Sequence, residues 1–182
     1  MSPQPVPDLQ AVKTGIAEES LLPSVSVVIP VFNEAQSLPL LVEAIHRSLA
    51  QTGIFYEIVV IDDGSTDGSG TLVQQLAGQD PQLKGILLRR NYGQTAAIAA
   101  GFDYAKGSII VTMDGDLQND PADIPRLLER LNQGYDLVSG WRKHRKDDLL
   151  TRLLPSVIAN WLIGAITGVK LHDYGCGLKV YR

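Results

Sequence analysis

The chain has 182 residues, of which 45% are hydrophobic and 20% are charged, and its formal net charge is −4. This length and composition indicate one globular domain and argue against a largely disordered chain. Because a net negative charge gives no general attraction to nucleic acid or anionic lipid, a nucleic-acid-binding protein is disfavoured, and any phosphate-bearing ligand must be held by local cations or a metal ion.

Residues 1–22 precede the first predicted strand and carry prolines at positions 3, 5 and 7. They lack the basic start and the apolar run of a secretory signal peptide. We therefore predict a flexible leader over residues 1–22, followed by one folded domain over residues 23–182. Cys176 has no second cysteine with which to form an internal disulfide, so it is predicted to be a small buried residue.

Short runs rich in β-branched residues alternate with longer helical patterns along the rest of the chain. The strands predicted from these runs cover residues 24–31, 57–63, 83–90, 108–114 and 135–141. The helices predicted between them cover residues 38–50, 69–77, 93–107 and 121–133. We expect Ser37 to cap the first helix, Gly107 to end the third and Pro121 to begin the fourth.

Strands that are joined by helices of about ten or more residues have parallel crossover connections. The alternation of strands and helices therefore predicts an α/β fold with a mostly parallel sheet.

The stretch Leu153–Val169 has no charged residue and is 17 residues long, which is the lower limit for crossing a bilayer. It contains Pro155, Asn160 and two glycines. Two interpretations stay open: a helix that is partly core and partly amphipathic, or a membrane span.

Four polar clusters come where predicted strands end. Because ligands gather at the carboxyl ends of strands in an open parallel sheet, we expect these clusters to form one binding site. They are Asn33–Glu34, "DDGSTD" at 62–67, "RRNYG" at 89–93 and "DGDLQ" at 114–118.

Asp114 and Asp116 lie one residue apart at the exit of the fourth predicted strand, followed by Gln118. Two carboxylates and an amide oxygen are ligands that suit Mg²⁺ or Mn²⁺, and like charges at one locus repel unless a cation or a proton intervenes. The alternative is a capped turn made of ordinary loop residues. For Asp120, which precedes Pro121, we predict the role of a helix N-cap.

The loop "DDGSTDGS" at 62–69 brings carboxylates to the end of the second predicted strand. Asp62 and Asp63 could accept hydrogen bonds from a nucleobase N–H or from ribose hydroxyls, or they could simply belong to the turn. For Ser65 and Asp67 we expect a role in capping the next helix.

Basic residues gather in "GWRKHRKDD" at 140–148 and at Arg152. Beside a metal site they could neutralise a diphosphate leaving group, because arginine can bridge two phosphate oxygens. The alternative is a solvated loop.

Taken together, the clusters resemble an inverting family 2 glycosyltransferase of the GT-A type, a Rossmann-like, mostly parallel sheet flanked by helices. More narrowly, the chain is similar to the polyprenyl-phosphate glycosyltransferases related to dolichyl-phosphate mannose synthase and bactoprenol glucosyltransferase. The resemblance covers residues 24–182 and is carried by "VVIPVFNEAQSL", "VVIDDGSTDGS", "RRNYGQTAAIAAGFDYAKG", "VTMDGDLQNDP" and "HDYGCGLKVYR".

The resemblance implies transfer of a hexose from a nucleotide sugar, a UDP- or GDP-hexose, to a polyprenyl phosphate such as undecaprenyl or dolichyl phosphate. It also implies a dependence on Mg²⁺ or Mn²⁺ bound by Asp114, Asp116 and Gln118. The catalytic residues that it implies are Asp116, Arg152 and Asp173. The residues implied to bind the nucleotide sugar are Pro30, Phe32, Glu34, Asp62, Asp63, Asp114 and Arg182.

The length of the chain departs from the family's pattern. Members commonly continue into amphipathic helices and, in bacterial forms, two transmembrane helices, whereas this chain stops at Arg182. We therefore expect a C-terminally truncated catalytic domain over residues 23–182. We expect it on the cytoplasmic side of a membrane, either peripheral or anchored by a segment absent from this chain.

Two other functions are compatible with parts of the pattern. A haloacid-dehalogenase-like phosphatase also places two aspartates at a strand end, although usually after its first strand rather than its fourth. A shortened domain that binds a nucleotide without turnover is the second alternative.

Overall fold

The computed structural model describes residues 23–140 and 175–182. Within these ranges one six-stranded sheet has the order β3-β2-β1-β4-β6-β5. The strands are β1 (Val25–Val31), β2 (Tyr56–Asp62), β3 (Leu83–Leu87), β4 (Ile109–Thr112), β5 (Leu137–Ser139) and β6 (Lys179–Tyr181). The helices are α2 (Leu38–Leu49), α3 (Ser69–Gln79), α4 (Gln94–Tyr104) and α5 (Ile124–Leu131), and a 3-10 turn, η1 (Pro121–Asp123), precedes α5.

The first four strands are parallel to one another. β1 lies between β2 and β4, and β3 pairs with the outer side of β2. Val31 pairs with Asp62, and Asp62 pairs with Leu87, so β1, β2 and β3 end at the same level. The predicted α/β fold with a mostly parallel sheet is therefore confirmed, and the loops after these strands emerge at one edge.

β6 is a strand that the sequence analysis did not predict. It runs antiparallel between β4 and β5, with Val180 opposite both Val111 and Val138. As a result β5 points in the same direction as β4 without touching it. A strand of three residues is too short for its alternation to be recognised, and its place is decided by the two strands that it joins.

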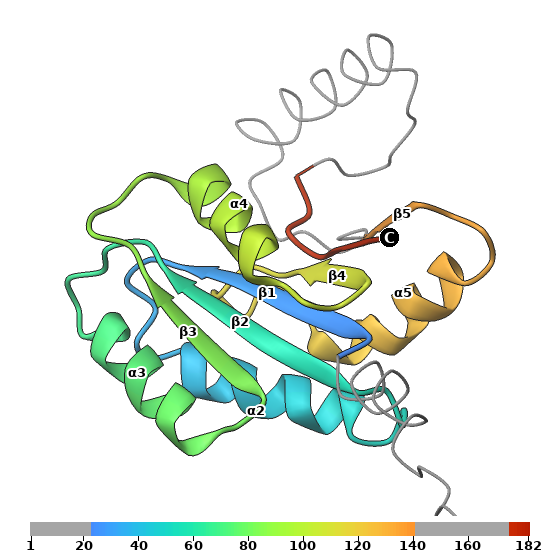
Figure 1. Ribbon diagram of the computed structural model, residues 1–182, viewed down its shortest axis with the longest axis horizontal. Coiled ribbons are helices and arrows are strands. Elements are labelled where there is room, and N and C mark those ends of the chain that lie inside the picture. The colour runs from blue at the N-terminus through green and yellow to red at the C-terminus, as the bar shows by residue number, and fades with distance from the viewer. Residues whose placement is uncertain (1–22, 141–174) are drawn as a thin grey trace, which may run out of the picture.

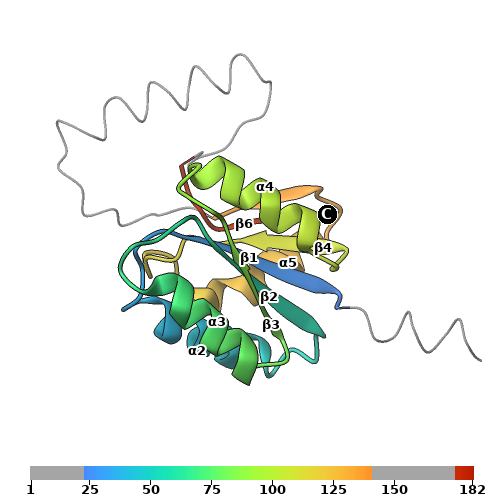
Figure 2. The same cartoon turned by 60° about the vertical axis from the view of Figure 1, so that its left-hand side comes forward.

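Helices cover both faces of the sheet. Figures 1 and 2 show α4 on one face and α2, α3 and α5 on the other. β1 contributes to both layers: Val27 and Ile29 belong to the larger core beneath α2 and α5, whereas Val28 packs in the smaller core beneath α4. This alternation follows from the two-residue period of a strand, and it explains why β1 is apolar on both sides.

Two predicted helix ends differ from the structure. α4 ends at Tyr104 rather than at Gly107. Gly107 is needed for a different reason, because a Cβ there would lie 2.6 Å from the backbone nitrogen of Ser26. Ser37 occupies the N-cap position of α2 but makes no capping hydrogen bond, since its hydroxyl donates to Glu34 Oε2 at 2.6 Å.

Two other local predictions are confirmed. Asp120 accepts a hydrogen bond from the backbone N–H of Ala122 at 2.9 Å and so caps the turn η1. Cys176 is only 2% exposed, and its thiol donates to Asn119 Oδ1 at 3.5 Å.

The predicted leader over residues 1–22 and the apolar stretch Leu153–Val169 lie outside the described residues. In the part of the chain that the structure describes, no helix is long and apolar enough to cross a bilayer.

Candidate functional site

A cavity of about 380 Å³ opens at the edge of the sheet where β1, β2 and β4 end. Four loops that lie far apart in the sequence build its wall. The lining residues are Pro30, Val31, Phe32, Glu34, Asp63, Asn91, Gly93, Gln94, Asp114, Gly115 and Asp116. All four polar clusters of the sequence therefore contribute to one cavity, as the strand-end rule predicts.

Asp114 and Asp116 form the acidic side of the cavity. β4 ends at Thr112, and the chain then leaves the sheet, which leaves Asp114 partly buried and Asp116 exposed. The turn is tight: Leu117 has a φ of 60°, and Asp116 Oδ1 accepts the N–H of Gln118 at 3.0 Å. The Gln118 side chain is exposed and does not line the cavity.

The loop after β2 supports another part of the cavity wall. Asp63 is 3% exposed, and its two carboxylate oxygens accept the backbone N–H groups of Tyr92 and Gly93, each at 2.8 Å. Gly64 has a φ of 70°, and a Cβ on it would lie 2.3 Å from the carbonyl carbon of Arg90. Asp63 and Gly64 therefore hold the loop after β3 in place, so that Asn91 and Gly93 can face the cavity.

The loops after β1 and β2 are joined to each other. The backbone N–H of Asn33 donates to Ser65 Oγ, and the N–H of Glu34 donates to Ser69 Oγ, both at 2.9 Å. Asp67 accepts from the Ser69 hydroxyl and N–H, and these bonds hold the pKa of Asp67 below its ordinary value. The capping role predicted for Asp67 and Ser65 is wrong, because Gly68 occupies the N-cap position of α3 and no side chain caps it. Asp67 instead bonds Ser69 and the N–H of Ala35, and Ser65 accepts from the loop after β1.

Asp62 is buried apart from the cavity. It is 4% exposed, its Oδ2 accepts the N–H of Ser65 at 3.3 Å, and its Oδ1 has no hydrogen-bond partner among residues 23–140 and 175–182. The structure therefore separates the two neighbouring aspartates: Asp63 borders the cavity, and Asp62 lies beneath the first turn of α3, close to Gly70.

Arg182 lies at the opposite edge of the sheet. β6 is antiparallel to β4, so Tyr181 pairs with Ile110 near the start of β4. Arg182 follows it there, and its guanidinium donates to the carbonyl of Leu131 at 3.2 Å. The position predicted for nucleotide-sugar binding is thus not brought to the cavity, because the antiparallel direction of β6 carries the chain away from it.

The predicted residues fall into three groups. The cavity brings together Pro30, Phe32, Glu34, Asp63, Asp114 and Asp116. It does not include Asp62, Gln118 or Arg182. Arg152, Asp173 and residues 141–148 of the basic run lie outside the described residues.

Sequence analysis gave no individual role to five residues that line the cavity, namely Val31, Asn91, Gly93, Gln94 and Gly115. Gln94 donates from Nε2 to Asp114 Oδ1 at 2.6 Å. Asn91, Gly93 and Gly115 belong to clusters that the strand-end rule places at the site, although the sequence singles out none of the three. The contact between Gln94 and Asp114 joins positions twenty residues apart and has no signal in the sequence.

The donor set fits a hard divalent cation. Asp114 and Asp116 offer carboxylate oxygens to the same cavity, and Mg²⁺ is typically held by one or two carboxylates while water and substrate phosphate complete its shell. Within the described ranges, no group of three or more His, Cys, Asp or Glu side chains is placed to hold a metal ion. The fit therefore rests on this pair together with ligand oxygens.

Comparison with known sequences identifies related proteins over most of the chain. The family model described as Glycosyl transferase family 2 matches residues 26–182. A dodecaprenyl-phosphate galacturonate synthase from Rhizobium johnstonii is 51% identical over 159 residues, which is 86% of this chain and 47% of the relative. An undecaprenyl-phosphate 4-deoxy-4-formamido-L-arabinose transferase from Shewanella sediminis is 48% identical, covering 87% of this chain and 48% of that protein. The chain thus spans about half the length of these relatives.

Solved structures show a shared fold. The mannosyltransferase PcManGT from Pyrobaculum calidifontis, in complex with GDP-Man and Mn²⁺, matches with a TM-score of 0.64 and 23% identity, over 88% of this chain and 44% of that one. Glucosyl-3-phosphoglycerate synthase from Mycobacterium tuberculosis, in complex with UDP, matches with a TM-score of 0.62 and 23% identity, over 91% and 58%. These neighbours have the GT-A fold, so the predicted fold class is confirmed.

Proposed function

Because the chain belongs to glycosyl transferase family 2, we propose that it is the catalytic part of an enzyme that transfers a sugar from a nucleoside diphosphate sugar to a polyprenyl phosphate. The observation that carries the proposal is the identity of 51% and 48% to relatives named for sugar transfer to dodecaprenyl and undecaprenyl phosphate. The cavity supports it independently, because four separate loops place polar groups around a space of about 380 Å³.

The cavity suits a nucleoside diphosphate that is bound together with a divalent cation. Phe32 is 45% exposed and offers an apolar surface beside Pro30, where a base or ribose can lie. Asp114 and Asp116 line the same cavity, and such acidic groups attract a diphosphate only through a cation. A Mg²⁺ or Mn²⁺ ion held by Asp114 and Asp116 would supply the positive charge that stabilises the departing diphosphate.

The proposed reaction is a single in-line displacement. An oxygen of the acceptor phosphate forms a bond to the anomeric carbon while the bond from that carbon to the diphosphate oxygen breaks, so the configuration inverts. The acceptor phosphate is already an anion near neutral pH and needs little help from a base. Arg152 is proposed to contact the phosphate groups, and Asp173 is proposed to act at the acceptor.

The proposed lipid acceptor implies where in the cell the enzyme works. A polyprenyl phosphate lies in a membrane, so we propose that the enzyme works at the cytoplasmic surface, peripherally or through a segment outside residues 1–182. The sugar is proposed to be a hexose or a closely related sugar, since the relatives carry the names of a galacturonate synthase and a formamido-arabinose transferase.

A product assay tests the proposal. The full chain is incubated with UDP- and GDP-linked glucose, mannose, galacturonate and 4-deoxy-4-formamido-arabinose, each with Mg²⁺ or Mn²⁺ and undecaprenyl phosphate. We expect release of the nucleoside diphosphate that depends on the lipid and is suppressed by EDTA. Phosphate released from a phosphomonoester would instead indicate a phosphatase, and nucleotide binding without any product would indicate a non-catalytic domain. The family match disfavours the phosphatase.

A further inference from the structure

The carboxylate of Asp114 is enclosed between α4 and the segment that leads into β6. On one side Gln94, the first residue of α4, donates from Nε2 to Asp114 Oδ1 at 2.6 Å. On the other side lies Gly177, where a Cβ would be 1.9 Å from Asp114 Oδ2 and 2.3 Å from its Cγ. The present orientation of Asp114 is therefore compatible only with a residue that has no side chain at position 177.

Gly177 is itself fixed to β4. Its carbonyl accepts the hydroxyl of Thr112 at 3.0 Å, and Thr112 is 4% exposed. Gly177 therefore cannot retreat from Asp114 without breaking this hydrogen bond. Two elements from distant parts of the chain, α4 and the approach to β6, thus contact the carboxylate.

Gln94 also stands where two cavities meet. The cavity of about 380 Å³ and a second one of about 240 Å³ are both lined by Pro30, Gln94 and Asp114. The second cavity continues between α4 and β6 as far as Tyr181. The bond between Gln94 and Asp114 consequently forms part of the wall between the two spaces, and its loss would free the carboxylate to turn toward either.

The chemical nature of the hydrogen-bond donor, the amide of Gln94, matters as well. A primary amide orients a carboxylate through a hydrogen bond but carries no charge, so Asp114 keeps its full attraction for a cation. A lysine or arginine at position 94 would offer a stronger bond but would repel the same ion. An uncharged donor at this place therefore orients the carboxylate without repelling a cation.

We propose that Gln94 is a positioning residue that holds Asp114 in the orientation needed to bind the divalent cation. Gly177 leaves the space that the carboxylate occupies in this orientation. The proposal rests on the metal site of the proposed function. Partners that orient a metal ligand contribute about 10- to 100-fold to metal affinity or activity.

The first test measures metal binding without turnover. Gln94→Met keeps the length and the helix propensity of the side chain but removes the donor. Mn²⁺ is titrated calorimetrically into the full chain, first alone and then with UDP or GDP present, because diphosphate oxygens would complete the metal's shell. We expect the Mn²⁺ dissociation constant to rise about tenfold in Gln94→Met and in Gly177→Ala. In Gln75→Ala, a matched control at an exposed position of α3, it stays at the wild-type value.

A second test shows whether the effect passes through Asp114. In an Asp114→Ala background, Gln94→Met should produce no further change in Mn²⁺ affinity, because the carboxylate that it positions is gone. Circular dichroism of each variant reports whether the fold is kept, and Gly177→Ala provides an independent variant if Gln94→Met folds poorly.

The outcomes separate this proposal from the proposed function. Unchanged Mn²⁺ affinity in Gln94→Met overturns the role of Gln94. So does a loss of Mn²⁺ affinity on Gln94→Met in the Asp114→Ala background that equals the loss in the wild-type background. A wild-type chain that binds no Mn²⁺ either alone or with UDP or GDP present overturns the metal site and this proposal with it. A wild-type chain that binds Mn²⁺ but forms no glycolipid refutes sugar transfer, and the effect of Gln94 on metal affinity can still be measured.

Discussion

Asp114 and Asp116 leave the sheet one residue apart, yet their surroundings differ. Asp114 is partly buried and receives a hydrogen bond from Gln94, whereas Asp116 is exposed and accepts only a local N–H, that of Gln118, among the contacts of the described residues. The difference indicates different roles for the two carboxylates. In the proposed metal site, Asp114 would be oriented in advance by the protein, while Asp116 would adjust to the ion and its other ligands.

We predict that Asp116→Asn abolishes metal-dependent binding of the nucleotide sugar. The change keeps the size of the side chain but removes the charge that a divalent cation needs. Since loss of an orienting partner already costs about 10- to 100-fold, loss of a direct ligand should weaken binding beyond that range. Calorimetry with the nucleotide sugar that is active in the product assay, in the presence of Mn²⁺, measures the effect.

The matched control is Asp120→Asn. Asp120 belongs to the same loop but caps the turn η1 outside the cavity, and asparagine is an equally good cap. Its affinity for the nucleotide sugar should equal that of the wild type. If Asp116→Asn bound the donor with unchanged affinity in Mn²⁺, the assignment of Asp116 as a metal ligand would be wrong.

At the scale of elements, α4 packs closer to the sheet than it could if position 101 carried a side chain. Gly101 faces β1 and β2, and a Cβ on it would lie 2.4 Å from Val28 Cγ1 and 2.7 Å from Ile61 Cδ1. This contact fixes the height of α4 above the sheet. Since Gln94 begins the same helix, it also fixes how far Gln94 is from Asp114.

Gly101→Ala is therefore expected to lower the free energy of unfolding by about 1–3 kcal/mol through overpacking, although alanine favours a helix. The control is Gly78→Ala in α3, where a Cβ meets nothing within 4 Å. There the same change should raise the free energy of unfolding by up to about 1 kcal/mol. Urea denaturation measures both, and stabilisation by both changes would contradict the close contact of α4.

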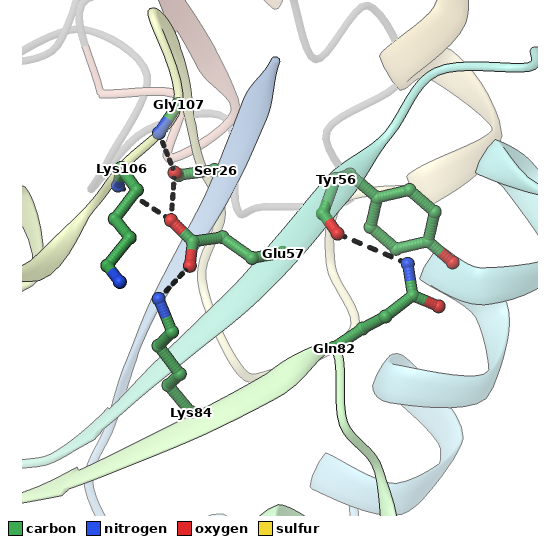
Figure 3. Close-up of polar contacts among 7 residues, drawn as sticks. All are labelled: Ser26, Tyr56, Glu57, Gln82, Lys84, Lys106 and Gly107. Atoms are coloured by element: carbon green, nitrogen blue, oxygen red, sulfur yellow. Dashed lines mark hydrogen bonds and ion pairs between the residues drawn. The ribbon is translucent and has the colours of Figure 1, made fainter. Parts of the chain in front are cut away.

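A second element-scale feature is a buried carboxylate that joins three strands. Glu57 on β2 is 4% exposed and accepts from Ser26 Oγ on β1 and from the N–H of Lys106, both at 2.6 Å, while Lys84 Nζ on β3 forms an ion pair with it (Figure 3). The N–H of Gly107 in turn donates to Ser26 Oγ at 2.8 Å. The cluster ties the amino ends of β1, β2 and β3 to the turn between α4 and β4.

This cluster makes stability depend on pH. Burial raises the pKa of Glu57, but the hydrogen bonds from Lys84, Ser26 and Lys106 outweigh burial and bring the pKa below its ordinary value. A carboxyl whose pKa is lowered by folding stabilises the protein fully above its unfolded pKa of about 4.3, and this contribution is lost as the pH falls through the lower, folded value.

We expect Glu57→Gln to be less stable than the wild type at pH 7, and the difference to become smaller as the pH is lowered to about 4 and below. Urea midpoints at several pH values measure it. Glu43→Gln is the control, because the exposed pair of Glu43 and Arg47 contributes little at any pH. A difference between wild type and Glu57→Gln that is constant with pH would refute the role of the charge.

At the scale of the whole molecule, the sheet is completed from the far end of the chain. β6 fills the gap between β4 and β5, and its approach places Cys176 and Leu178 in the same core as β1 and α2. The same approach places Gly177 against Asp114. The same segment therefore contributes both to the core and to the surroundings of Asp114.

Leu178→Ala tests this long-range closure. Leu178 is 3% exposed, and removal of a buried leucine side chain should lower the free energy of unfolding by about 2–5 kcal/mol. Leu40→Ala on α2 is the matched control, since Leu40 is 58% exposed and its loss should change stability by less than about 0.5 kcal/mol. Similar urea midpoints for the two variants would show that residues 175–182 add little to the core.

Much of the architecture could be predicted because it is encoded locally. Apolar runs predict five of the six strands found in residues 23–140 and 175–182, with ends within three residues of those observed. The strand-end rule brings Glu34, Asp63 and Asp114 to one cavity. Asp120 was recognised as a cap because capping involves only its near neighbours. Such features depend on spacing within a short segment, and the sequence displays that spacing directly.

The sequence by itself determined the α/β class, the order of the first strands and helices, and the family. Only the tertiary structure decided that Asp62 lies beneath α3 while Asp63 borders the cavity, that Arg182 lies at the opposite edge, and that Gln94 meets Asp114. Each of these depends on the direction of a strand or on a contact between distant segments. Such relations arise only when the chain is packed, because nothing in local spacing distinguishes one long-range partner from another.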